Sequence, residues 1–454
     1  MNKKITITAA VLSLILGAGN TIAAISESEA ERLGKDLTPV GAERAGNADG
    51  SIPEWKGGLT QAPAGYQPGQ FLVDPFADDK PLFVITAQNM EQYKNRLSPG
   101  QMAMLKKYPD FKMPVYPSRR TAAYSQEIYD DIKTHAVTAK LTSGGNGVEG
   151  RGLHAPFPIP ENGLEAIWNH ALRFRGLSHK RTTVQMPVQE NGSFVANRFV
   201  DIWAFPESFT GGRDAQKDAN ISAYFLQIMK SPPRLTGNVL LVHETLDQVK
   251  QPRKAWRYNA GQRRVRRAPQ VAYDAPGTGA DGLRTVDNFD MFNGAPDRYN
   301  WKLVGKKELY IPYNAYKLHS PDLSYEQIHQ KGHLNPEYTR YELHRVWVVE
   351  ATLKEGARHI YGKRTFYLDE DTWQAAVIDH YDTRGNLWRV AEAHKIQYYD
   401  EKIPFYTAEA LYDLQSGRYL TIGLTNEEKE PYIFNIGEER KSFQPAALRR
   451  AGKR

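Results

Sequence analysis

Two histidines have the spacing of metal ligands. His329 and His333 are four residues apart, and His319 and Glu326 are near them in sequence. On a regular helix this spacing places both imidazoles on one face, where they could bind zinc. A glycine at 332 and a proline at 336 bracket the second histidine, so a regular helix through both is disfavoured. The pattern leaves a zinc site open but favours solvated loop histidines.

Two other short motifs are weaker still. Residues 145–150 match the dinucleotide fingerprint formally, but the run that follows reaches a proline at 156 and cannot open the required helix, so we expect a flexible loop. Residues 47–50 resemble part of a calcium loop, but Ala45 and Lys56 occupy positions that need carboxylates. That pattern favours an Asx-type turn.

The familiar catalytic signatures are missing from the sequence. It contains no His-Glu-x-x-His helix, no Gly-x-Ser-x-Gly elbow, no phosphate-binding Gly-x-x-x-x-Gly-Lys run and no cysteine. We therefore predict no catalytic residues, no metal and no cofactor. Paired carboxylates cannot be recognised from sequence alone, so hydrolase chemistry of the glycosidase kind remains an alternative.

The densest charge cluster is basic. On a strand the side chains of residues 263–267 alternate between two faces, so both faces carry cations. Such a strand suits the edge of a sheet that contacts anionic head groups or a partner, and the alternative is a solvated edge protected from aggregation. The candidate contact residues are Arg263, Arg264, Arg266 and Arg267.

Aromatic residues are abundant, with 25 Tyr, 17 Phe and 8 Trp, and they provide candidate contacts for a hydrophobic ligand. We expect three of them on one face of one strand, two further residues on the next strand, and one tryptophan on a helix. A pure core role is the alternative for each, since a large sheet needs such residues anyway. The candidates are Phe199, Trp203 and Phe205, then Tyr224 and Leu226, and Trp168.

The elements that must position these residues are mainly strands. Residues 182–188 alternate with period two, Asn191-Gly192 is a strong hairpin signal, and residues 193–205 return as the partner strand. About a dozen such segments between 182 and 425 predict one large antiparallel sheet. So large a sheet should curl, and the predicted helix at 162–174 and the insertion at 269–296 should cover its concave face. The result would be a half-barrel that encloses an apolar cavity.

The remaining chain divides into three parts. Residues 1–23 have the basic start, apolar run and small-residue exit of a cleavable signal peptide, so we expect a periplasmic protein, and with no cysteine it should not be a lipoprotein. Residues 24–152 are rich in proline and predict an irregular extension with short helices at 87–107, broken near Pro99, and at 118–138. The half-barrel should span residues 153–430. Residues 431–454 form a tail with a frayed end.

Several stretches of the sequence carry a resemblance to known proteins. Residues 256–267 and 364–388 resemble paired hairpins of the LolA/LolB superfamily of periplasmic lipoprotein carriers. The whole mature chain, including residues 33–43 and 46–50, resembles the domain-of-unknown-function family 1329 (DUF1329). The resemblance implies a half-barrel with a helical lid that holds an acyl chain, a lipid or another hydrophobic molecule.

Several functional expectations follow from this resemblance and from the composition. The protein would carry its ligand between an inner-membrane exporter and an outer-membrane acceptor, and we expect a monomer. A formal charge of only +7 argues against a nucleic-acid partner. An envelope hydrolase and a non-catalytic structural role in the envelope are the alternatives.

Overall fold

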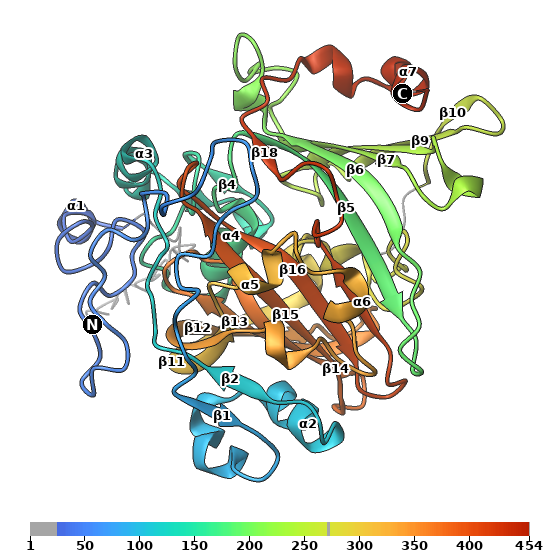
Figure 1. Cartoon of the computed structure of the whole chain (residues 1–454). Helices are drawn as coiled ribbons and strands as arrows, with labels where there is room; N and C mark the ends of the chain where they lie inside the picture. Colours follow the sequence, from blue (N-terminus) through green and yellow to red (C-terminus); the bar gives the residue numbers. More distant parts are fainter. Residues whose placement is uncertain (1–24, 270–272, 454) are drawn as a thin grey trace, which may run out of the picture.

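A single sheet of sixteen strands dominates the computed structural model, which describes residues 25–269 and 273–453 (Figure 1). The predicted signal segment lies outside the described residues. The strand order is β1-β2-β12-β13-β14-β15-β16-β17-β5-β6-β7-β8-β9-β10, with β11 paired to β12 and β18 to β5. The strands of this sheet are β1 (Phe83–Ile85), β2 (Met113–Val115), β5 (Ser178–Val188), β6 (Asn197–Ala204), β7 (Ile221–Met229), β8 (Val239–Thr245), β9 (Lys254–Asn259), β10 (Arg264–Arg267), β11 (Tyr299–Pro312), β12 (Tyr341–Leu353), β13 (Tyr361–Asp369), β14 (Ala375–Asp382), β15 (Leu387–Tyr398), β16 (Ile403–Asp413), β17 (Tyr419–Ile422) and β18 (Ile433–Phe434).

The sheet has two halves, which we call the floor (β11 to β17) and the wall (β5 to β10). They join where β17 pairs with β5, with Tyr419 opposite Val188. In Figure 1 the floor occupies the lower part of the molecule, and the wall rises from it and curves to the upper right. The predicted curved half-barrel is therefore confirmed.

The prediction of a purely antiparallel sheet is corrected at one point. Strand β2 of the N-terminal extension pairs with β12 in parallel, with Tyr341 opposite Val115. A short β1–β2 hairpin thereby joins the floor, so the sheet is mixed. Sequence periodicity could not reveal this pairing, because β1 and β2 have only three residues each.

The concave face of the floor is covered by helix α4 (Gly163–Leu172) and by the segment 273–298, as predicted for the described part of that insertion. Asn162 caps α4 by accepting a hydrogen bond from the Glu165 amide at 3.0 Å. Asp290 of the segment forms ion pairs with Arg173 and Arg175, just beyond the end of α4. The segment also contacts the floor directly, because Arg364 of β13 pairs with its Asp287 at 2.9 Å.

The N-terminal extension wraps the molecule, as expected. Its longer helices agree with the predictions, since a 3₁₀ helix at Met90–Arg96 is followed by a helix that begins at Pro99, and the 118–138 region contains one helix. Residues 145–150, predicted as a flexible loop, instead include β4 (Val148–Glu149), which pairs with β3 (Lys140–Leu141) in a hairpin. The other helices are α1 (Glu27–Ala30), α2 (Pro99–Lys107), α3 (Gln126–Ala136), α5 (Tyr316–His319), α6 (Tyr325–Ile328) and α7 (Leu448–Ala451).

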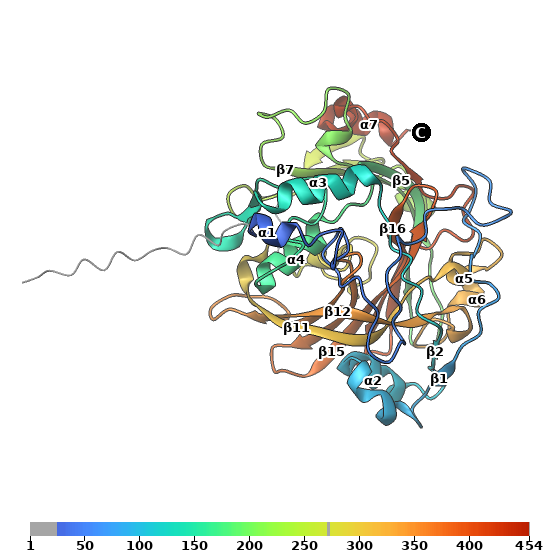
Figure 2. The same ribbon diagram turned by 90° about the vertical axis from the view of Figure 1, so that its left-hand side faces the viewer.

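The C-terminal tail covers the convex face of the wall with residues that precede 449–454, the basic end for which fraying was predicted. Phe443 and Leu448 are fully buried in one cluster with Leu241 and Tyr258 of the wall. Figures 1 and 2 both place α7 against the strands of the wall. Apolar residues of the tail therefore bury a sheet face that would otherwise meet water. None of the helices in residues 25–269 and 273–453 combines the length and apolar character needed to cross a membrane.

Candidate functional site

An apolar groove lies on the concave face of the wall, between strands β6 to β9 and the segment 277–293. One cavity of about 120 Å³ is lined by aromatic and aliphatic side chains of the sheet, among them Trp203, Phe225, Leu240 and Val242. Phe289 of the segment closes it from the opposite side. A second cavity of about 280 Å³ adjoins the first, since both are lined by Gln227, Leu240, Arg257 and Thr278. We call these two cavities together the groove.

Strand register decides which side chains enter the groove. Trp203 of β6 is opposite Phe225 of β7, and Phe225 is opposite Val242 of β8. Residues directly opposite in an antiparallel pair point to the same face, so these three side chains form one row across the wall. Leu240, two residues before Val242, continues the same face and is only half-buried. The groove is therefore a part of the sheet surface that the segment 277–293 covers incompletely.

Cations surround the outer end of the groove. Arg253 lines it and pairs with Glu244 at 3.2 Å, while Arg257 is exposed at its rim. A further cavity of about 520 Å³ shares Arg253 and Ala255 with the groove and extends to Lys254 and Arg267. The open end of an apolar groove next to basic side chains suits a ligand with an apolar chain and a negative charge.

Buried ion pairs form the inner end of the groove, toward the floor. Gln227 donates to Asp201 at 2.9 Å, and Asp201 lies 3.4 Å from Arg181. Arg175 lies over the rings of Trp203 and Phe205, at 5.1 and 5.7 Å from their centroids. Arg175 therefore holds both aromatic rings in place by cation–π contact.

Two carboxyl groups at this inner end have opposite pKa shifts. Burial raises the pKa of Glu409, and the nearby Asp290 carboxylate raises it further, to about 8. Burial would also raise the pKa of Asp290, but Arg173 and Arg175 more than offset it and hold that pKa at about 2. At neutral pH Glu409 is therefore mostly uncharged while Asp290 is ionised.

The predicted ligand contacts do not share one site. Phe199 and Trp203 line the groove, and Phe205 packs beside Trp203 with ring centroids 6.2 Å apart. Tyr224 and Leu226 lie on the opposite, convex face under the C-terminal tail. The residues of β7 that face the groove are Phe225 and Gln227, and which side of the strand faces inward cannot be read from one strand alone.

Trp168 also lies away from the groove. It packs in a separate cluster beside α4 with Phe157 and Leu172, and its indole donates to the Gly145 carbonyl at 2.9 Å. Its role is to hold the β3–β4 hairpin against α4. The sequence prediction missed groove residues of the covering segment, such as Phe289, and of β8, such as Leu240.

The arginine cluster lies where it was predicted, on an edge. Strand β10 is last in the strand order, and all its residues are exposed. Arg263 is in the turn between β9 and β10 with a φ of 52°, and Arg264, Arg266 and Arg267 follow on the strand. Arg267 also lines the outer cavity that adjoins the groove, so the cluster lies close to the open end of the groove.

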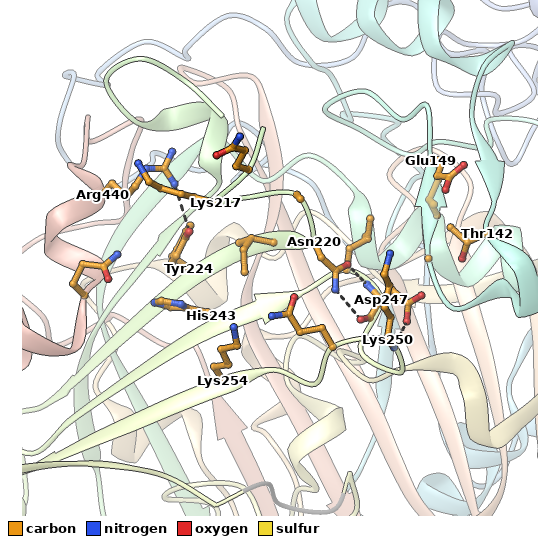
Figure 3. Close-up of a pocket in the computed structure, with 18 residues that line it drawn as sticks. Thr142, Glu149, Lys217, Asn220, Tyr224, His243, Asp247, Lys250, Lys254 and Arg440 are labelled. Carbon is orange, nitrogen blue, oxygen red and sulfur yellow. Dashed lines mark hydrogen bonds between the residues drawn. The ribbon is translucent and has the colours of Figure 1, made fainter. Parts of the chain in front are cut away.

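A larger, polar cleft of about 660 Å³ occupies the other face of the wall (Figure 3). Tyr224, His243 and Lys254 are opposite one another on β7, β8 and β9 and form its base. The cleft has charged side chains on its sides, including Lys217, Asp247, Lys250 and Arg440. Because it lacks a continuous apolar wall, the cleft suits polar ligands, in contrast to the groove.

The histidines with metal-like spacing are buried, which corrects the prediction that they are solvated. Helix α6 ends at Ile328, and His329 bonds the Tyr325 carbonyl and the Thr421 hydroxyl at 2.6 and 2.7 Å. His333 is fully buried and bonds the Leu334 carbonyl at 2.7 Å, and His319 bonds the Thr407 hydroxyl at 2.9 Å. The three imidazoles therefore bond to different partners in the core, and within the described chain none shares a partner with another. The Asx-type turn is confirmed, because the Asp49 side chain accepts a hydrogen bond from the Ser51 amide two residues on, at 3.0 Å.

One group in the described part of the chain does have metal-ligand spacing. The ligand atoms of His344, Asp369 and Asp371 lie within 4.8 Å of one another, and all three residues are buried. Asp371 is held by two hydrogen bonds from Arg120, at 2.7 and 2.9 Å, and Asp369 is paired with Lys395. Both carboxylates are thus already neutralised by protein cations, which makes the group a buried ion-pair network.

These features define a class of protein, an open half-barrel with an apolar groove on its concave face. The chain belongs to the DUF1329 family, described as a protein of unknown function, whose model matches residues 84–449. An uncharacterised protein of Pseudomonas aeruginosa is 58% identical over 452 residues, with 99% of each chain covered.

Two solved structures are similar at lower identity. A DUF1329 family protein from Desulfovibrio piger matches at 14% identity and a TM-score of 0.42, over 60% of this chain and 92% of its own. A LolA superfamily protein from Nitrosomonas europaea matches at 11% identity and a TM-score of 0.38, over 63% of this chain and 98% of its own.

Proposed function

We propose that the protein is a periplasmic carrier or chaperone that binds a hydrophobic ligand in the groove for transfer across the envelope. The observation that carries this proposal is the row formed by Trp203, Phe225 and Val242, whose shared face is left partly uncovered beside Leu240. Apolar surface in contact with water favours an apolar ligand by about 25 cal/mol per Å² that the ligand covers.

Several features suit a carrier better than a tight receptor. The two cavities of the groove are small, about 120 and 280 Å³, so they fit one chain better than two. The groove opens toward the edge strands β9 and β10, which gives a ligand a route in and out. A carrier must release its ligand, so affinity in the micromolar range is expected.

The direct test of binding is native mass spectrometry of protein purified from its own periplasm, followed by titration with a fluorescent hydrophobic probe. We expect a bound lipid-like mass, and saturable probe binding that a lipid extract competes away. Absence of saturable binding by any hydrophobic probe would contradict the proposal and would favour an envelope hydrolase or a structural role.

Location is part of the same proposal and needs its own test. Residues 1–23 have the pattern of a cleavable signal, and the chain has no cysteine that could be acylated. We expect the mature, unacylated protein in osmotic-shock fluid. Recovery only from detergent-extracted membranes would contradict this. The exporter and acceptor that such a carrier needs would be found by in vivo crosslinking from residues of the β10 edge.

A further inference from the structure

One buried cation in the groove lacks a carboxylate partner. Four buried arginines on or beside the concave face each have a carboxylate oxygen within 4 Å. Arg173 and Arg175 pair with Asp290, Arg181 with Asp201, and Arg364 with Asp287. Arg284 lines the groove and is 5% exposed, but in the described part of the chain it forms no ion pair.

The surroundings of Arg284 do not neutralise it. The only hydrogen bond of its side chain within the described residues is from Nη1 to the Thr285 carbonyl at 3.3 Å, and its Nε is buried without any partner. Three carboxyl groups act on it electrostatically: Glu409, whose pKa is raised by burial, and Asp201 and Asp287, which are ion-paired with Arg181 and Arg364. A guanidinium cannot lose its proton at physiological pH, so the charge remains.

The packing holds this cation in place. A side-chain Cβ at Gly277 would lie only 2.6 Å from Cζ of Arg284, so glycine is needed there for the guanidinium to lie against the chain. Cζ also lies 5.6 Å from the centroid of the Phe289 ring. The guanidinium is therefore held between the backbone of the segment and an aromatic wall of the groove, beside apolar surface.

An unpaired, buried guanidinium is costly unless an anion meets it. We infer that the groove recognises a single-chain amphiphile with an anionic head, a carboxylate or a phosphate monoester, and that Arg284 binds this head while the chain lies along Phe225, Leu240 and Val242. This inference rests on the proposed function, because it names the chemical class of the hydrophobic ligand. A guanidinium matches the two oxygens of such a head with two parallel hydrogen bonds.

The acidic side chain of the groove does not oppose this assignment. Glu244 is the carboxylate that lines the same cavity, and it is paired with Arg253 and contacted by the Asn293 amide at 3.4 Å. Its charge is therefore compensated locally.

A ligand series on the wild-type protein tests the inference without any mutation. Delipidated full-length mature protein carrying a fluorescent apolar probe would be titrated at pH 7, where Glu409 is still mostly protonated, with dodecanoic acid, dodecyl phosphate, dodecanol and methyl dodecanoate. We expect the acid or the phosphate to displace the probe at least about tenfold more effectively than the alcohol and the ester, as one charge-assisted interaction implies. The two anionic arms tell which head group is preferred.

Two variants then locate the preference. Arg284→Met should bring the acid and the alcohol to within about threefold of each other, because it removes the cation and keeps the apolar stem. Lys217→Gln, in the polar cleft of the other face, should leave the preference unchanged. Arg284→Lys should retain part of it, since a point charge replaces the fork.

The outcomes separate this inference from the function on which it rests. Equal displacement by acid, phosphate, alcohol and ester in the wild type would overturn the anionic head and leave a hydrophobic carrier. A preference that persists in Arg284→Met would also overturn the assignment, with Arg253 and Arg257 as the remaining cations of the groove. Displacement by none of the four compounds, together with no probe binding, would overturn both proposals.

Discussion

The floor and the wall are parts of one sheet, but they differ in how their faces are covered. Every residue of β16 is buried, and most of β13 to β15 is buried as well, because both faces are covered by helices and segments. In the wall, β9 has only one buried residue and β10 has none. The comparison suggests that the floor supplies stability and the wall supplies the binding surface. The predictions below test that division.

The largest expected effect is at Asp290, whose carboxylate pairs with Arg173 and Arg175. Asp290→Asn leaves Arg173 and Arg175 without their shared carboxylate, and an uncompensated buried charge costs about 3–5 kcal/mol. Asparagine also tolerates the left-handed backbone at this position, where φ is 53°, so the loss can be assigned to charge. Urea unfolding measures the free energy.

The matched control is Asp281→Asn, which removes the exposed partner of Arg418 at another left-handed position. It should cost less than about 1 kcal/mol, as surface pairs do. Equal losses of unfolding free energy in both variants would mean that the buried ion pairs of Asp290 contribute no more stability than an exposed pair.

The second effect concerns a carboxyl group buried in the floor. Burial raises the pKa of Glu392 to about 7, although Gln101 and Tyr341 donate hydrogen bonds to it. The unfolded chain ionises near pH 4.5 and the folded chain near 7, so stability contributed by this group is lost as pH rises through that window. Glu392→Gln should therefore stabilise the protein at about pH 8, by up to about 3 kcal/mol.

The pH dependence distinguishes this effect from simple repacking. Below about pH 4, where both states are protonated, the variant and the wild type should have the same unfolding free energy. Glu355→Gln in an exposed turn is the control and should change stability at neither pH. A stability gain at Glu392 that does not depend on pH would contradict the raised pKa.

A smaller effect, seen in binding rather than stability, should come from the wall. Leu240 is half-buried and lines both cavities of the groove, so Leu240→Asp should weaken binding of an apolar probe by more than about tenfold. The melting temperature should change little, because the side chain is not part of the packed floor. Val195→Asp is the control, since Val195 is 59% exposed outside the groove. Equal weakening by both substitutions would place the probe elsewhere.

The smallest expected effect on the fold is at the edge of the wall. Arg264→Glu with Arg266→Glu changes two exposed residues of β10 and should shift the unfolding free energy by less than about 0.5 kcal/mol. Binding to anionic vesicles, measured by sedimentation, should weaken. The loss of binding should be larger at low salt, because exposed charges are less screened there. If vesicle binding is unchanged while circular dichroism is also unchanged, the cluster is only a solvated edge.

Much of the fold followed from local pattern. The hairpin signal at Asn191-Gly192 and the apolar face of residues 162–174 predicted β5, β6 and α4, because turn chemistry and periodicity are local properties. The packing of the tail was not predicted, since nothing in its sequence indicated that Phe443 and Leu448 would be fully buried.

The site was harder to predict. Phe199 and Trp203 do line the groove, but choosing between Tyr224 and Phe225 required the register of β7 against β6, and a shift of one residue exchanges the two faces. Arg284 could not be found from sequence at all. Its importance comes from the absence of an ion-pair partner, which depends on how the fold places carboxyl groups such as Glu409 and Asp201 around it.

The central claim is that the hydrophobic ligand lies in the groove on the concave face of the wall. A fatty acid with a photoreactive diazirine on its chain, crosslinked to the purified protein and located by peptide mass spectrometry, tests it most directly. We predict labelling of peptides that contain Phe225, Leu240 or Phe289, which excess unlabelled fatty acid suppresses. Suppressible labelling confined to the polar cleft around His243, or to the outer helices α2 and α3, would contradict the account.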